Sequence, residues 1–181
     1  MSEVRVFRED SPVKPERVIK DEAGIAKALG AEGVTFARWQ ASVSLKPGDG
    51  QDEVLKAYAG PIAKLRKDKG YQAADVVRMV PDAPNRAEAR AKFLKEHTHA
   101  EDEVRFFVEG TGSFYLHFSP RVYQVICERG DLMSVPAGTR HWFDMGPAPR
   151  FTAIRLFTNP DGWVAKFTGA EIAARFPAFG E

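Results

Sequence analysis

Apolar residues recur at helical spacing in the first half of the chain. Four of them follow one another at intervals of four, four and three positions: Val54, Tyr58, Ile62 and Leu65. This spacing places them on one face of a helix that packs on a core. A Gly-Pro pair at residues 60–61 interrupts the stretch, and proline inside a helix removes a backbone hydrogen bond. The pattern therefore predicts two short helices or one kinked helix.

The rest of the first half predicts one further helix and three strands. Asn85 and Glu88 form a capping pair for a helix that runs to about Lys95, because such side chains accept from the free N–H groups of a helix start. Short strands are expected over three segments: Glu3–Arg8, Val34–Gln40 and Asp75–Val80.

The pattern changes near residue 96. Six short runs rich in aromatic and β-branched residues follow: Val104–Glu109, Ser113–Phe118, Val122–Cys127, Asp131–Val135, Trp142–Met145 and Phe151–Thr158. Glycine and proline separate them, which is typical of a barrel or a double-sheet jelly roll. A last helix is expected over Ala170–Arg175.

The length of 181 residues suits one domain. We expect a single mainly β domain with added helices over residues 1–181. Its helix-containing part covers about 1–95, its barrel core about 75–160 and its final helix about 170–176.

Composition excludes several classes of protein. Lys and Arg number 26 and Asp and Glu 25, a net charge of +1, so no nucleic-acid partner is expected. The single cysteine, Cys127, excludes an internal disulfide framework and a CxxC zinc site, and we expect it to be a small core residue. The N-terminus lacks an apolar signal region and no run of 18 apolar residues occurs. We therefore expect a cytoplasmic protein with no membrane partner, and a monomer because no apolar surface stripe is left over.

Two closely spaced histidines indicate chemistry. His97 and His99 project to one side of an extended chain, and Glu103 and Arg105 share their parity. Polar groups aimed into a small barrel need a partner, because burial without one costs several kcal/mol. A divalent metal ion supplies it, since imidazole and carboxylate suit Fe(II), Ni(II), Mn(II) or Zn(II). The alternate residues are apolar and face the other way: Val104, Phe106 and Val108.

The spacing extends into a two-part motif. The first part is HxHx3Ex6G, from His97 to Gly110, and the second is Gx5PxGx2H, from Gly130 to His141. An isolated HxH beside an acidic run is more often a surface pair, but both parts together resemble the cupin superfamily signature. Ala91 and Met145 stand where that pattern often has Gly and Asn; neither position is a ligand.

The resemblance to cupins implies a double-stranded β-helix, which is a jelly-roll barrel. It also implies one metal ion held by His97, His99, Glu103 and His141. Three nitrogens and one oxygen fill four of six octahedral positions and leave two for a chelating ligand, whereas a structural zinc site is closed at four.

A longer resemblance surrounds these ligands. The segments Lys95–Phe106, Val135–Asp144, Arg155–Thr158 and Gly162–Trp163 resemble the acireductone dioxygenase family of the methionine salvage pathway. The resemblance implies a dioxygenase that cleaves 1,2-dihydroxy-3-keto-5-methylthiopentene with O2. With Fe(II) it implies 4-methylthio-2-oxobutanoate and formate as products, and with Ni(II) it implies 3-methylthiopropanoate, formate and carbon monoxide.

The same resemblance suggests roles for three further residues. It assigns Arg105 to the substrate dianion, Glu96 to metal incorporation and Asp102 to relaying structural change around the site. The chemistry of Arg105 agrees, because a guanidinium is always charged and binds oxygen anions in a fork.

Other side chains are candidates for the substrate pocket. Arg155 is a second cation in the same sheet system, and Phe93, Phe143 and Trp163 offer an apolar pocket for a methylthio tail, although aromatic residues in a barrel are more often plain core. His117 is expected to be structural or half-buried.

Two alternatives stay open. One is another cupin dioxygenase with the same ligands, acting on a thiol or a β-diketone. The other is a non-catalytic cupin that senses a small ligand, although no helix-turn-helix pattern or basic patch is visible.

Overall fold

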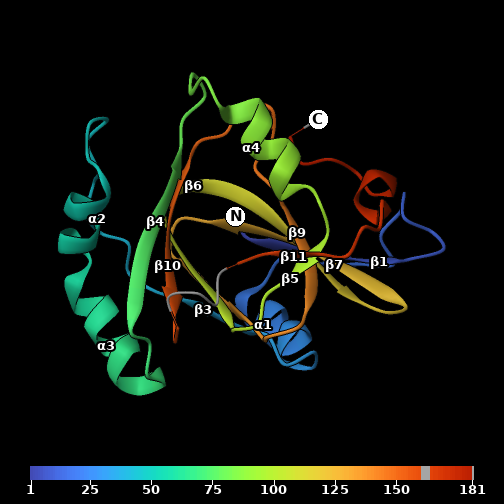
Figure 1. Cartoon of the computed structure of the whole chain (residues 1–181). Coiled ribbons are helices and arrows are strands. Elements are labelled where there is room, and N and C mark those ends of the chain that lie inside the picture. Colours follow the sequence, from blue (N-terminus) through green and yellow to red (C-terminus); the bar gives the residue numbers. More distant parts are fainter. Residues whose placement is uncertain (160–163, 181) are drawn as a thin grey trace.

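The computed structural model of the chain describes residues 1–159 and 164–180. Its strands form two antiparallel sheets that share one strand (Figure 1). The first sheet has the order β11 (Lys166–Phe167), β5 (His97–Thr98), β9 (Arg140–Asp144), β6 (Glu103–Phe118), β7 (Arg121–Glu128), β1 (Glu3–Arg8) and β2 (Arg17–Ile19). The second has the order β4 (Ala73–Met79), β10 (Phe151–Phe157), β6, β8 (Asp131–Val135) and β3 (Thr35–Arg38).

The shared strand β6 passes from one sheet into the other. Residues up to Gly110 pair with β8 and β10, and residues from Thr111 pair with β7, joined by β9 from Ser113. Gly110 has φ +70°, and a Cβ there would lie 1.8 Å from the carbonyl oxygen of Arg150. The prediction of two separate strands, Val104–Glu109 and Ser113–Phe118, was therefore wrong, because the glycines bend the strand and change its partners without reversing the chain.

Three apolar clusters pack against the sheets. The largest lies between them and includes Phe107, Phe114, Phe143 and Phe151. A second covers the outer face of the second sheet under the helices, and a third, around Trp142, lies against the outer face of the first sheet. Two sheets packed around an inner core confirm the predicted mainly β, cupin-type barrel.

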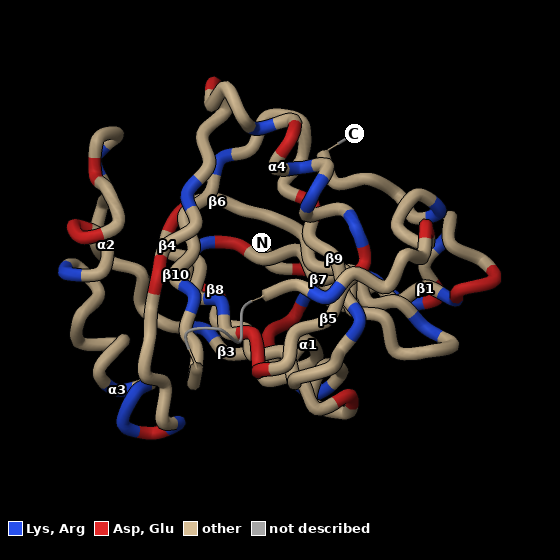
Figure 2. The backbone as a smooth tube through the Cα atoms, in the orientation of Figure 1, with Lys and Arg blue, Asp and Glu red and all other residues tan. Residues whose placement is uncertain are grey.

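The helices lie outside the barrel. They are α1 (Glu22–Gly30), α2 (Gln51–Ala57), α3 (Ala59–Lys69), α4 (Arg86–Phe93) and the short 3₁₀ helix η1 (Ile172–Arg175). The expected apolar stripe is divided between α2 and α3, which break at Tyr58, so the prediction of two short helices is confirmed. Basic residues gather in the last turn of α3 (Figure 2), where their positive charge interacts favourably with the negative end of the helix dipole. No helix in the described part of the chain is both long and apolar enough to cross a membrane.

Two expectations about the helices, the Asn85 cap and the type of the last helix, were wrong, and the end of α4 differs from the expected position by two residues. Asn85 precedes α4 but makes no side-chain capping bond, because its backbone has ψ 7° and not the extended conformation that capping needs. The helix also ends at Phe93, before Lys95. The last segment is a four-residue 3₁₀ helix in place of the expected helix over Ala170–Arg175, and Phe176 N–H donates to Ala173, three residues back.

Candidate metal centre

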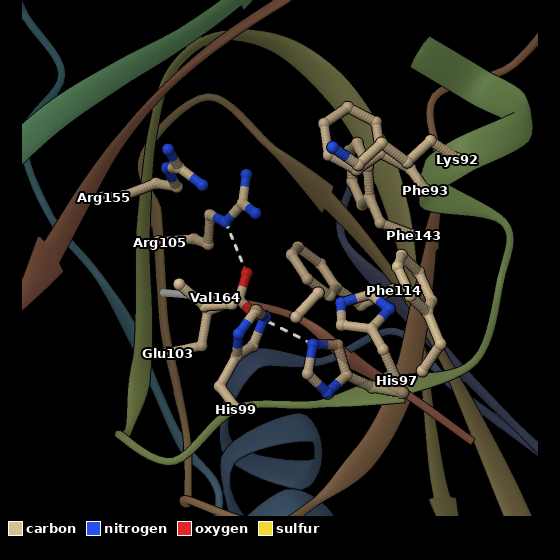
Figure 3. Close-up of a pocket in the computed structure, with 13 residues that line it drawn as sticks. Lys92, Phe93, His97, His99, Glu103, Arg105, Phe114, Phe143, Arg155 and Val164 are labelled. Carbon is tan, nitrogen blue, oxygen red and sulfur yellow. Dashed lines mark hydrogen bonds and ion pairs between the residues drawn. The ribbon is translucent and has the colours of Figure 1, made fainter. Parts of the chain in front are cut away.

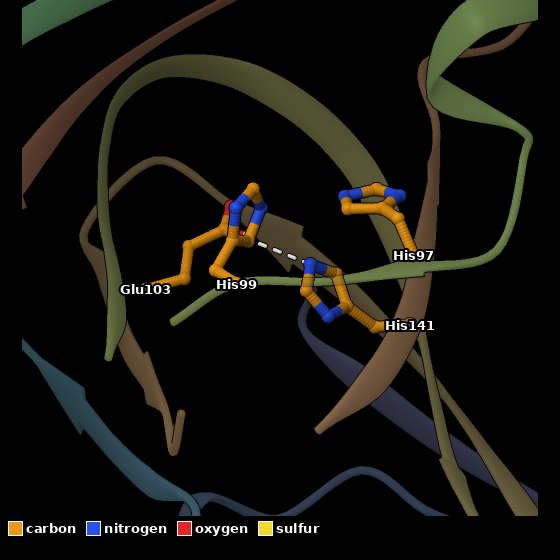
Figure 4. A group of neighbouring side chains, drawn as sticks. All are labelled: His97, His99, Glu103 and His141. Atoms are coloured by element: carbon orange, nitrogen blue, oxygen red, sulfur yellow. Dashed lines mark hydrogen bonds and ion pairs between the residues drawn. The ribbon is translucent and has the colours of Figure 1, made fainter. Parts of the chain in front are cut away.

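Four side chains, three from strands β5, β6 and β9 and one from the residue that follows β5, meet inside the barrel (Figure 4). One ligand atom from each of His97, His99, Glu103 and His141 lies within 4.8 Å of the others. His97 on β5 is the direct cross-strand partner of His141 on β9, and their ring centroids are 4.4 Å apart. In the sequence His97 and His141 belong to two separate motifs and are 44 positions apart. The pairing of β5 with β9 brings the two motifs together.

Strand alternation explains which side chains enter the barrel. Glu103 and Arg105 share the parity of Phe107, which lies in the inner core. The predicted outer set, Val104, Phe106 and Val108, packs in the cluster under α2 and α3. The structure thus has the two faces that the alternation predicted.

Backbone carbonyl groups orient two of the imidazole rings. His97 Nδ1 lies 2.7 Å from the carbonyl oxygen of Lys95, and His141 Nδ1 lies 2.8 Å from that of Thr139. A carbonyl oxygen only accepts, so each Nδ1 carries the proton and donates. Each Nε2 then presents a lone pair, which is the arrangement found around metal-ligating histidines.

The donor set fits a cation. Glu103 Oε2 lies 2.8 Å from His141 Nε2 and 3.1 Å from His99 Nε2. A carboxylate oxygen facing an imidazole lone pair is repulsive unless a positive species lies between them. His99 Nδ1 is buried without a hydrogen-bond partner among the described residues. Convergent lone pairs in a buried site match a divalent metal ion.

Burial and charge shift the ionisation of this cluster. Burial, reinforced by the His141 charge, lowers the pKa of His97 to about 4. Burial alone would raise the pKa of Glu103, but Arg105 and His141 outweigh it and hold that pKa well below its usual range. A neutral His97 ring beside an ionised Glu103 carboxylate is the pair of protonation states that a metal ion requires of these two ligands.

A pocket of about 290 Å³ opens above the four side chains (Figure 3). Arg105 and Arg155 form one wall, and Phe93, Phe114 and Phe143 lie opposite. The remaining lining residues are Lys92, Val164, Ala165 and Phe167. Sequence reasoning missed these four and Phe114, although Lys92 stands beside a residue that it did select.

Arg105 bridges the metal ligands and the pocket. Its Nε donates to Glu103 Oε1 at 2.6 Å, and its guanidinium carbon lies 5.5 Å and 5.8 Å from the ring centres of Phe114 and Phe143. Burial lowers the pKa of Arg105, the Arg155 charge adds to this effect, and Glu103 opposes it. Both Nη groups have no hydrogen-bond partner among the described residues, so they are available to an oxygen anion.

Arg155 is held differently. It is the cross-strand neighbour of Arg105, but its Nε and Nη2 donate to the two oxygens of Asp75 at 2.8 and 2.5 Å. Its charge is thus balanced by a carboxylate outside the metal cluster. It lines the pocket with fewer donors to spare than Arg105.

The other selected residues lie around the centre. Glu96 is buried next to His97, but its carboxylate bonds to His117 and Thr168. Asp102 accepts from the backbone N–H of Ala137 at 2.9 Å, which ties the start of β6 to the turn before β9.

Three residues stand apart from the cluster. His117 is buried outside it, in line with a structural role. Cys127 lies in the inner core, and burial raises the pKa of its thiol well above the usual value. Trp163 lies outside the described residues.

Known proteins resemble this chain along most of its length. The model of the ARD/ARD' family matches residues 4–165. An acireductone dioxygenase of Alcanivorax borkumensis is 55% identical over 175 residues, which cover 97% of each chain. One from Pseudomonas aeruginosa is 54% identical over 177 residues, 98% of each chain.

A solved structure shares the fold. It is an acireductone dioxygenase from Bacillus anthracis with a cadmium ion in its active centre. The TM-score is 0.79 at 33% identity, and the match covers 92% of this chain and 98% of the other.

Proposed function

The chain belongs to the ARD/ARD' family, and from this premise we propose that it is an acireductone dioxygenase with one Fe(II) or Ni(II) ion per chain. Its substrate would be 1,2-dihydroxy-3-keto-5-methylthiopentene, cleaved with O2. The main observation behind the proposal is that three imidazoles, one carboxylate and a buried guanidinium line a single pocket.

The four proposed ligands are His97, His99, Glu103 and His141. A divalent ion held there supplies Lewis acidity and a template for oxygen ligands. The protein side chains set the geometry: carbonyl groups fix the rings of His97 and His141, and Arg105 fixes one oxygen of Glu103.

The pocket has the polarity that an acireductone needs. The enediol end of the substrate carries acidic protons and is stabilised as an anion near positive charge. Arg105 faces that end with two Nη groups, in surroundings of aromatic rings that exclude water and strengthen the interaction. Arg155 adds positive charge at longer range.

An apolar wall faces the two arginines. Phe93 and Phe143 pack edge to face with ring centres 6.0 Å apart, and we assign the methylthio tail of the substrate to this side. The tail then turns away from the arginines, so the pocket orients the substrate by polarity at both ends. Glu96 and Asp102 act from outside the pocket, the first on metal loading and the second on the loop between β5 and β6.

The identity of the metal would select the products. With Fe(II) we expect 4-methylthio-2-oxobutanoate and formate, and with Ni(II) 3-methylthiopropanoate, formate and carbon monoxide. Both ions accept three imidazoles and a carboxylate, so the same ligands serve both reactions.

The test is turnover by protein reconstituted with one metal at a time. Metal-free protein is loaded with Fe(II) or Ni(II) under reducing conditions, and O2 uptake is measured with synthetic acireductone. A thiol and a β-diketone serve as comparison substrates. Consumption of O2 only with acireductone supports the proposal. Loss of the thiol or β-diketone with no acireductone turnover overturns it in favour of another cupin dioxygenase.

A further inference from the structure

A buried histidine outside the metal cluster lies between two carboxylates. The side chain of His117, on the second half of β6, is 4% exposed. Its Nδ1 lies 2.5 Å from Glu96 Oε1, and its Nε2 contacts Glu9 Oε1. Carboxylate oxygens accept, so both ring nitrogens donate when the ring is an imidazolium. One imidazole ring therefore joins the N-terminal segment to the residue before His97.

The second oxygen of Glu96 is held from the C-terminal side. Thr168 Oγ1 donates to Glu96 Oε2 at 2.7 Å, and Thr168 N–H donates to the carbonyl oxygen of Glu96 at 3.0 Å. The carboxylate of Glu96 is thus occupied by β6 on one oxygen and by the residue after β11 on the other. We call Glu96, His117, Glu9 and Thr168 the Glu96 cluster.

The Glu96 cluster lies behind a proposed metal ligand. Glu96 and His97 are adjacent, and successive side chains of an extended chain point to opposite faces. His97 enters the barrel, whereas Glu96 is bonded on the other side with His117, which has the parity of the outward Tyr115. Holding Glu96 therefore fixes the backbone from which His97 projects.

The same contacts set the surroundings of His97. Its cross-strand partners are His141 on β9 and Phe167 on β11, and the Phe167 ring lies 5.9 Å from the imidazole. Thr168 is the next residue after Phe167. Its hydrogen bonds to Glu96 hold β11 against β5, and so hold Phe167 at the wall of the pocket.

We propose that His117 and Thr168 are positioning residues for the metal centre. By occupying both oxygens of Glu96 they fix the β5 backbone that carries His97 and the β11 strand that lies beside it. The proposal rests on the proposed function in one respect, the role of His97 as a ligand. Residues that orient ligands from outside the coordination shell are worth about 10–100-fold in metal affinity.

The first experiment uses Thr168, because its side chain is at the surface and its substitution leaves the core intact. Binding of Ni(II) and Co(II) to metal-free full-length protein is measured by calorimetric titration. Thr168→Val should raise the dissociation constant for Ni(II) by about tenfold. Thr168→Ser, which keeps the hydroxyl, should bind as the wild type does. Thr35→Val, an exposed threonine on β3, is the matched control and should change nothing. The visible spectrum of bound Co(II) should shift in Thr168→Val alone.

The second experiment asks whether the effect passes through Glu96. His117→Gln removes the ring that contacts both Glu96 and Glu9, and it should weaken Ni(II) binding more than Thr168→Val does. In a Glu96→Ala background, Thr168→Val should cause no further loss of affinity. Equal losses in both backgrounds would show that Thr168 acts elsewhere and would overturn the proposal. If His117→Gln fails to fold, the Thr168 series decides the question alone.

The outcomes separate this proposal from the proposed function. Wild-type protein that binds neither ion would remove the metal centre itself. Wild-type protein that binds Ni(II) tightly, together with a Thr168→Val variant of equal affinity and unchanged Co(II) spectrum, would overturn only the positioning roles.

Discussion

Glu103 and Arg105 are joined on the inner face of β6 by a hydrogen bond of 2.6 Å from Arg105 Nε to Glu103 Oε1. The other oxygen of the same carboxylate lies against His99 and His141. One carboxylate therefore links the other proposed metal ligands to the guanidinium that lines the pocket, and both side chains project from the same strand.

Removal of a single imidazole should empty the metal centre. Wild-type protein should contain about one transition-metal ion per chain, because the four donors form one site. His97→Ala or His141→Ala should lose most of it, since each ring is one of only three nitrogen donors. Elemental analysis after purification in metal-free buffer measures this. Retention of a full equivalent by His141→Ala would show that the ion is held elsewhere.

Loss of Arg105 should impair catalysis without loss of metal. Arg105→Ala removes the buried cation with free Nη groups, so activity should fall by about 100–1000-fold, the range for removing a preorganised charge-stabilising donor. Metal content should be retained, and the absorbance of the bound substrate dianion should disappear.

Arg66→Ala is the control for that experiment. Arg66 is an exposed arginine on α3, and its loss should leave turnover unchanged. Wild-type turnover by Arg105→Ala would transfer the role to Arg155, which keeps its fork on Asp75.

Exchange of the metal should change the products. Metal-free protein is reconstituted separately with Fe(II) and Ni(II) and given acireductone and O2. The nickel form should release carbon monoxide into the headspace and the iron form should not, because the ions differ in size and preferred geometry and so in the oxygens they chelate. Gas chromatography of the headspace detects the difference. Identical product mixtures would mean that the protein, and not the metal, selects the products.

Gly110→Ala should destabilise the fold. The residue has φ +70° and a Cβ would meet a backbone carbonyl at 1.8 Å, so strain and overlap should together cost at least about 2 kcal/mol. Gly70→Ala is the control: φ is +75° but no atom lies within 4 Å of the added Cβ, and strain alone costs about 1 kcal/mol. Urea unfolding followed by tryptophan fluorescence measures both. Equal losses would show that the bend in β6 tolerates a side chain.

Tyr123 should make stability fall at alkaline pH. Burial, with the adjacent Glu32 carboxylate, raises the pKa of Tyr123 to about 12. Between the ordinary value near 10 and this raised value, the unfolded chain loses a proton that the folded protein keeps, so the free energy of unfolding falls as pH rises. Tyr123→Phe should show a smaller fall between pH 9 and pH 11.5 in urea unfolding experiments. A fall as steep as that of the wild type would assign the effect to other groups.

Much of the fold follows from local patterns. The alternation around Glu103 predicted both faces of β6. The break between α2 and α3 at Tyr58 was predicted from the Gly-Pro pair at residues 60–61, which lies in the first turn of α3. The 3₁₀ form of the last helix was not predictable from the local pattern. The helix has only four residues, and its conformation depends on the packing of Ile172, Ala173 and Phe176 against the first sheet. Helix α1 was not predicted, although its sequence carries a clear signal: Asp21 caps the helix, and Ile25, Ala28 and Leu29 are its buried residues.

Some parts of the candidate site were likewise predictable from the sequence and others were not. Strand parity predicted that His97 and Glu103 lie on one side, but His141 joined the proposed ligand set only through the resemblance to the two-part cupin motif. The partners of Glu96 and the position of Phe114 were not, since they depend on the bend at Gly110 and on the docking of residues 164–168 against β5. Long-range pairing of this kind leaves no local mark in the sequence.

The shared strand also limits how this chain can change in length. Side chains of a strand alternate, so one residue inserted between Glu103 and Arg105 would send the guanidinium to the outer face, under α2 and α3, while the carboxylate stayed inside. No described residue of α2 or α3 lines the pocket. Insertions and deletions on that helical side, for example in the loop at residues 41–50, should therefore be tolerated. A single one in β6 would instead separate the Arg105 guanidinium from the Glu103 carboxylate.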